Sequence, residues 1–143
     1  MSTGEKLKVR ASETPASTHR GGEIRITLSP RTAGATSGFG GVLTLGPGEA
    51  IIEHYHPYSE EFIHIIVGEV DFFIDGERIP LEPGDSLLVP IGARHKMVNL
   101  SQTTTVQAVF HLSPLAPLPA LGHVDLEPPV VASAPLPQVG GVG

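Results

Sequence analysis

Short runs of alternating apolar and polar residues dominate the chain from Glu23 onward. Eight such runs, separated by turn residues, cover residues 23–29, 41–45, 50–56, 61–68, 70–74, 86–90, 95–100 and 104–112. Alternation with period two is typical of half-buried strands, because successive side chains of a strand point to opposite faces. Many short strands at this spacing predict an all-β fold, either an antiparallel sandwich or a barrel.

The residues between the runs support the same fold class. The 143 residues include 17 Gly and 14 Pro, a density that leaves little room for long helices. Asp75 and Gly76 stand between two strand-like runs, and this pair is typical of a two-residue type I′ hairpin, in which both turn residues have positive φ. We therefore predict a tight hairpin at this point.

Both ends of the chain lack the alternation. Residues 1–20 are polar and aperiodic, so we predict an N-terminal arm, then one domain over residues 21–126 and a C-terminal tail over residues 127–143. After Leu112 the chain is rich in Pro, Leu and Val and has no Lys or Arg. Such a segment is too irregular for a sheet yet too apolar to stay solvated. We expect it to lie along the domain or a partner subunit, and we predict a homodimer.

The charge and the absence of Cys exclude several classes of function. The formal net charge is −6, with 15 acidic and 9 basic residues. Binding to nucleic acid or to an anionic membrane requires a surplus of Lys and Arg, so neither partner is expected. Without Cys, any metal must be held by His, Asp or Glu. The sequence shows neither an apolar leader nor an apolar run of about eighteen residues, and we expect a cytoplasmic protein.

Five of the seven His residues fall in the strand-rich part of the chain. His54 and His56 stand two apart on a strand-like run, so both imidazoles point to one face. A turn then brings Glu60 or Glu61 back opposite that face, and a later turn delivers His95 at the start of another strand. Three imidazoles and one carboxylate are donors that suit a divalent metal of borderline softness.

The remaining His residues are weaker candidates. His111 ends the last strand-like run, and if its face is the interior it is a fourth imidazole ligand or a general base. If its face is the exterior, a hydrogen bond to the tail is expected instead. His64 follows Glu61 by three residues, which places the two on opposite faces of a regular strand. His19 lies in the arm and His123 lies in the Pro-rich segment after Leu112, and we expect both at the surface.

The spacing of these residues resembles the two-part signature of the cupin superfamily. The two halves read Gly48-x5-His54-x-His56-x4-Glu61-x6-Gly68 and Gly84-x5-Pro90-x-Gly92-x2-His95-x3-Asn99. The resemblance implies a single cupin domain, a small antiparallel β-barrel of jelly-roll type. It also implies a metal inside the barrel, held by the residues that match the motif ligands: His54, His56, Glu61 and His95. Fold alone does not define the reaction, because cupins host many chemistries.

A longer stretch, residues 20–125, resembles a narrower group. The segments "RGGEIRITLSPRTAGATSGF", "EHYHPYSEEF", "LLVPIGARH" and "FHLSPLAPLPALGHVD" are similar to the single-domain cupin cyclases of bacterial aromatic polyketide pathways, of the tetracenomycin and resistomycin type. The resemblance implies a cyclase that guides aldol-type ring closure of a poly-β-ketone, a small-molecule substrate presented by an acyl carrier protein or just released from it.

Such chemistry needs a metal and a base. We expect Zn²⁺, with Fe²⁺, Mn²⁺ and Ni²⁺ as alternatives, bound by His54, His56 and His95 and completed by Glu61 or His111. The base is a metal-bound hydroxide, or whichever of Glu61 and His111 is not a ligand. The alternative functions are a metal-dependent dioxygenase acting on a diketone or polyphenol, and a small-molecule binder without catalysis.

Overall fold

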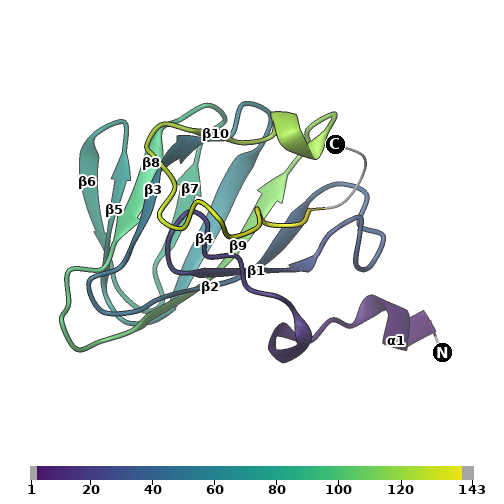
Figure 1. Cartoon of the computed structure of the whole chain (residues 1–143), viewed down its shortest axis with the longest axis horizontal. Coiled ribbons are helices and arrows are strands. Elements are labelled where there is room, and N and C mark those ends of the chain that lie inside the picture. Colours follow the sequence, from purple (N-terminus) through teal and green to yellow (C-terminus); the bar gives the residue numbers. More distant parts are fainter. Residues whose placement is uncertain (1–2, 140–143) are drawn as a thin grey trace.

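The structure is a computed structural model that describes residues 3–139, and over this range it is nearly all β (Figure 1). The strands within it are β1 (Glu23–Leu28), β2 (Phe39–Leu45), β3 (Ala50–Tyr55), β4 (Glu60–Val67), β5 (Val70–Ile74), β6 (Glu77–Leu81), β7 (Ser86–Val89), β8 (His95–Val98), β9 (Val106–Ser113) and β10 (Val124–Asp125). The helical elements are α1 (Thr3–Leu7), η1 (Ala11–Glu13) and η2 (Pro119–Leu121).

The strands form two sheets whose neighbours are all antiparallel. One sheet has the order β1-β2-β9-β4-β7 and the other the order β10-β3-β8-β5-β6. Consecutive strands therefore alternate between sheets at several points, notably from β3 to β4. The predicted all-β fold, an antiparallel sandwich of jelly-roll type, is confirmed, and the interior between the sheets holds both the apolar core and the candidate ligands.

Alternation along the strands decides which side chains reach this interior. On β9, Val106, Ala108, Phe110 and Leu112 are buried while the residues between them are exposed. On β4 the buried set includes Ile63 and begins with a carboxylate. Burying these apolar side chains supplies the main stabilisation of the fold, at roughly 25 cal/mol per Å² of apolar surface.

The hairpin between β5 and β6 has the predicted geometry. Asp75 has φ of 49° and Gly76 has φ of 84°, and the register pairs Ile74 with Glu77 across the two-residue turn. Two consecutive positive φ values are the signature of a type I′ turn. The Asp75 side chain also accepts a hydrogen bond from the backbone N–H of Arg94 (3.0 Å), which ties the hairpin to the loop before β8.

The arm and the tail meet on the surface of the domain. In Figure 1, α1 lies apart from the sheets, whereas the tail returns across the molecule. The backbone N–H of Val130 donates to the carbonyl of His19 (2.9 Å), and the Ser17 hydroxyl donates to the carbonyl of Pro135 (2.8 Å). The tail therefore lies along its own domain over the described residues; its residues 140–143 and the first two residues of the arm lie outside them. Within the described chain, no helix is long and apolar enough to cross a membrane.

Adjacent residues on β4 provide a direct test of the two-faced sheet. Ile65 is 0% exposed in the core and Ile66 is 50% exposed on the outer face. We expect Ile65→Ala to lower the free energy of unfolding by about 2–5 kcal/mol, because it removes buried methyl groups and leaves a cavity. The control Ile66→Ala should cost less than about 1 kcal/mol. Urea denaturation followed by circular dichroism measures both, and similar losses for the two variants would contradict the assigned register.

Candidate metal centre

The two imidazoles of the His-x-His pair enter the interior from the end of β3. His54 is the fifth residue of this strand and His56 is the first residue after it, and each is 7% exposed. In the antiparallel pairing of β3 with β8, His54 lies opposite His95. The predicted orientation of this pair toward one face therefore agrees with the structure, and β8 adds the third imidazole from the neighbouring strand.

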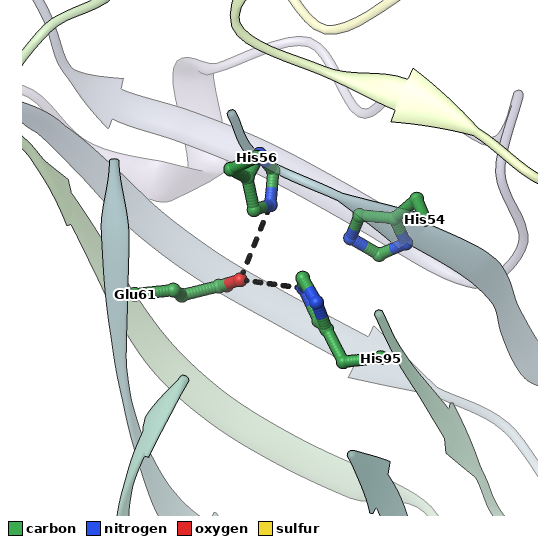
Figure 2. A group of neighbouring side chains, drawn as sticks. All are labelled: His54, His56, Glu61 and His95. Atoms are coloured by element: carbon green, nitrogen blue, oxygen red, sulfur yellow. Dashed lines mark hydrogen bonds and ion pairs between the residues drawn. The ribbon is translucent and has the colours of Figure 1, made fainter. Parts of the chain in front are cut away.

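Glu61 reaches the same point from the other sheet. The turn after His56 carries the chain across to β4, so the carboxylate faces the imidazoles across the interior and not from a neighbouring strand. Its Oε1 lies 3.0 Å from Nε2 of His95 and 3.3 Å from Nε2 of His56. One ligand atom from each of the four residues lies within 4.8 Å of every other, and Figure 2 shows the side chains pointing toward one another. Glu60 is only half-buried and is not in this group.

Backbone carbonyls determine which nitrogen of each ring faces the group. Nδ1 of His54 donates to the carbonyl of Ile52 (2.7 Å), and Nδ1 of His95 donates to the carbonyl of Ala93 (2.9 Å). Nδ1 of His56 donates to the carbonyl of Gly122, in the Pro-rich segment after β9 (3.0 Å). A carbonyl only accepts hydrogen bonds, so Nδ1 of each ring carries a proton. Nε2 is the atom that faces the group and would bind a metal, and any proton that Nε2 of His56 or His95 shares with Glu61 must leave when a metal binds.

This donor set fits a divalent metal. Three Nε2 atoms and one carboxylate oxygen are the ligands that Zn²⁺ and its first-row neighbours prefer in the absence of Cys. Each imidazole also has the outer hydrogen bond that commonly fixes the orientation of a metal-binding His. The cluster indicates metal binding without identifying the metal.

Burial and the neighbouring charges shift the pKa values of several residues in this group. Burial alone would raise the pKa of Glu61, but hydrogen bonds from His56 and His95 outweigh it and hold that pKa well below its usual range. Burial, followed by the nearby imidazole of His95, lowers the pKa of His54 well below its ordinary value. For His95, burial acts to lower the pKa, yet the hydrogen bond to Glu61 prevails and raises it. An ionised carboxylate and a neutral His54 are the protonation states that metal ligands need.

His111 and His64 are not brought to this group. His111 is exposed on the outer face of β9, because the inner positions of that strand belong to Phe110, Leu112 and their alternating partners. Sequence alternation allowed either face for His111, and the structure puts it on the outer face of β9. From there it is not among the residues that converge, so a role as ligand or base is not supported. His64 is half-buried on the outside of β4, where its Nδ1 bonds the Ser86 hydroxyl (2.7 Å).

A fourth imidazole does lie beside the cluster, and it comes from a segment expected at the surface. The ring of His123 stacks on His54 with centroids 4.4 Å apart and planes 11° apart, and it meets the edge of His56 at 4.8 Å. Burial, with the Arg20 cation nearby, lowers the pKa of His123 to about 2. Its spacing from Asp125, one residue between them, is the only sequence signal that it carries.

A cavity of about 890 Å³ opens onto these residues. Apolar side chains from both sheets, among them Leu43, Phe72 and Phe110, form much of its wall. The segment after β9 contributes Leu115, Pro117 and further residues to the same wall. The cluster thus faces a mostly apolar space that a small organic molecule of moderate size can fill.

Comparisons with known proteins agree with this architecture. The cupin domain family matches residues 41–111. The polyketide synthase CurC of Streptomyces cyaneus is 50% identical over 113 residues, which cover 79% of this chain and 73% of that protein. The tetracenomycin polyketide synthase protein TcmJ of Streptomyces glaucescens is 44% identical over 135 residues, which cover 94% and 89%. The polyketide cyclase RemF of Streptomyces resistomycificus shares the fold, with a TM-score of 0.67 at 16% identity over 84% of each chain.

Removal of one imidazole tests the metal centre. We expect His54→Ala and His95→Ala to weaken metal binding by more than the 10- to 100-fold typical of a lost outer partner, because no thiolate is present to compensate. Metal content after dialysis, measured by plasma mass spectrometry, reports the loss. His111→Ala is the matched control and should keep its metal. Full occupancy in both His54→Ala and His95→Ala would show that the site is wrongly placed.

Proposed function

The chain belongs to the cupin family of polyketide synthase proteins that includes CurC and TcmJ, and from this we propose that it is a metal-dependent polyketide cyclase. In this proposal it guides an aldol-type ring closure of a poly-β-ketone intermediate in aromatic polyketide biosynthesis. The observation that carries the proposal is a cluster of three imidazoles and one carboxylate facing a large apolar cavity.

Ring closure of a poly-β-ketone requires three things. One α-proton must leave, the resulting enolate must be stabilised, and the attacked carbonyl must be polarised. A divalent metal, with Zn²⁺ proposed here and Fe²⁺, Mn²⁺ or Ni²⁺ as alternatives, would supply Lewis-acid stabilisation when held by His54, His56, His95 and Glu61. The aldol reaction transfers no electrons between substrate and protein, so a redox-inactive ion is sufficient.

The cavity itself supplies the second part of the catalysis. Folding a flexible chain so that two particular carbons meet costs conformational entropy, and a shaped apolar wall offsets that cost by admitting few conformations. The same wall excludes water, which strengthens electrostatic interactions at the polar cluster. We infer that the apolar residues around the cluster, such as Leu43 and Phe110, select the folded conformation of the substrate.

Of the two roles expected for Glu61, ligand and base, we propose the ligand role. Its Oε1 converges with Nε2 of His56 and of His95, the atoms that would bind the metal, and these neighbouring imidazoles keep its pKa well below the usual range. A carboxylate with so low a pKa is a weak proton acceptor near neutral pH. It is, in contrast, well suited to remain ionised next to a cation.

The relatives and the surface of the domain also suggest proposals for the form of the substrate and for the assembly state. We propose that the poly-β-ketone arrives on an acyl carrier protein or just after its release from it. We also propose a homodimer, because the outer face of the sheet that contains β4 exposes neighbouring apolar side chains: Phe62 on β4 pairs in register with Leu88 on β7, and Val109 lies on β9. Apolar patches of this kind commonly mark protein interfaces.

Reconstitution with the minimal synthase and its carrier protein tests the function. Under anaerobic conditions we expect the addition of the protein to change the product mass only by loss of water, since aldol closure and dehydration consume no oxidant. The change should disappear in the His54→Ala, His56→Ala and His95→Ala variants. Mass spectrometry of the products reads the outcome.

Two other results would overturn the proposal in different ways. A strict requirement for oxygen, with labelled oxygen incorporated into the product, would make the protein a dioxygenase. An unchanged product profile in the presence of correctly metal-loaded protein would leave a binding role without catalysis.

A further inference from the structure

His123 is a polar group of the cavity wall that the proposed metal centre does not use. Its ring lies against His54 and His56, yet its nitrogen is not among the four ligand atoms that converge. The side chain is 18% exposed and lines the cavity. A polar ring held at this position, among mostly apolar wall residues, is placed to contact whatever molecule the cavity binds.

Two charged residues hold the ring of His123 in one orientation. Nε2 of His123 lies 2.8 Å from Oδ1 of Asp125, and Nε of Arg20 donates to the same oxygen at 2.8 Å. Arg20 is buried, and Asp125 is held on β10 by its pairing opposite His54 on β3. The His123 ring is therefore held by Asp125 at Nε2 and by the stacked ring of His54 on its face.

This arrangement determines which nitrogen of His123 is a hydrogen-bond acceptor. The Asp125 carboxylate only accepts hydrogen bonds, and its charge is already paired with the Arg20 cation, so Nε2 carries the one proton of the imidazole and Nδ1 carries a lone pair. Nδ1 has no hydrogen-bond partner within residues 3–139. Every fully buried side-chain nitrogen or oxygen in that range has a hydrogen-bond partner, so the unpaired Nδ1 is not fully buried. Because His123 lines the cavity, we take Nδ1 to be accessible to a molecule bound there.

We propose that Nδ1 of His123 accepts a hydrogen bond from the enol hydroxyl of the bound substrate and so selects the enol tautomer of a 1,3-dicarbonyl. Asp125 and Arg20 are positioning residues, which act by keeping the proton of His123 on Nε2. This inference rests on the proposed cyclase function. It adds to that function a residue that recognises the tautomer.

The hydrogen-bonding groups of the two tautomers explain why Nδ1 would bind the enol in preference to the diketo form. An enol offers one O–H donor that the diketo form lacks, and the diketo form offers only acceptors. A site built to bond a hydroxyl rejects an analogue without it, because its own polar atom is then left unpaired. An acceptor at Nδ1 therefore favours the enol, which is the carbon nucleophile of an aldol reaction.

Binding of two matched probes to the zinc-loaded full chain tests this role. The first probe is 1-phenyl-1,3-butanedione, which forms an enol readily, and the second is its 2,2-dimethyl derivative, whose central carbon has no proton to lose. Isothermal titration calorimetry gives the affinity of each probe, and plasma mass spectrometry gives the metal content. Neither readout depends on catalytic activity.

Two substitutions separate the two nitrogens of the ring. In His123→Gln the amide lies near the position of Nε2, so the contact with Asp125 is kept and the acceptor at Nδ1 is lost. In His123→Asn the amide lies near the position of Nδ1, so an acceptor is kept. We expect His123→Gln to bind the enolisable probe about tenfold more weakly, the size of one hydrogen bond, with unchanged metal content and unchanged affinity for the dimethyl probe. His123→Asn should retain most of the affinity of the wild type.

Several outcomes would overturn the inference. Loss of metal in both His123 variants would make His123 a ligand or a structural support of the metal centre. Equal weakening of both probes in His123→Gln would show a role in packing alone. An unchanged preference for the enolisable probe in His123→Gln would contradict only the role of His123, whereas metal-loaded wild-type protein that binds neither probe would contradict the proposed cyclase function as well.

Discussion

The site depends on hydrogen bonds that turn three imidazoles in the same direction. The carbonyls of Ile52, Ala93 and Gly122 each accept the Nδ1 proton of one ring, so every Nε2 faces the carboxylate of Glu61. Burial of this many polar groups is unfavourable unless each is paired, and buried charges need a partner. The backbone pairs one nitrogen of each ring, and a cation between the remaining donor atoms would pair the other. The sandwich makes this possible, because β3 and β8 lie in one sheet and β4 lies in the other.

The segment after β9 links the fold to the chemistry of the cavity. It provides Gly122, whose carbonyl orients His56, and it provides His123, which stacks on His54. The Arg20 side chain reaches this segment through Asp125. A Pro-rich segment with little regular structure beyond η2 and β10 thus forms part of the cavity wall and supports the candidate ligands at the same time. Changes in this segment are therefore expected to alter the site even though it lies outside the two sheets for most of its length.

The strands and the shared orientation of His54 and His56 could be predicted from sequence because they depend on local periodicity, whereas the hairpin was indicated by its turn residues and His95 by the spacing of the cupin signature. Alternation gives the relative orientation of neighbouring residues, which is why His54 and His56 face one way. Alternation does not say which of the two faces is the interior, so it cannot place His111, which lies on the outer face of β9. His123 has no periodic neighbours to reveal it, since its position results from contacts with residues about a hundred positions away, such as Arg20 through Asp125.

X-ray absorption spectroscopy of the protein purified without added metal tests whether His54, His56, His95 and Glu61 bind one ion, because it reports the metal and its ligands together. We predict a zinc edge and a coordination shell of three imidazole nitrogens at about 2.0–2.1 Å and one carboxylate oxygen at about 2.0–2.2 Å. Outer-shell scattering from the rings should match three imidazoles bound through Nε2. A metal-free protein, or a first shell with fewer than three imidazoles, would contradict the convergence of His54, His56, His95 and Glu61 on one ion.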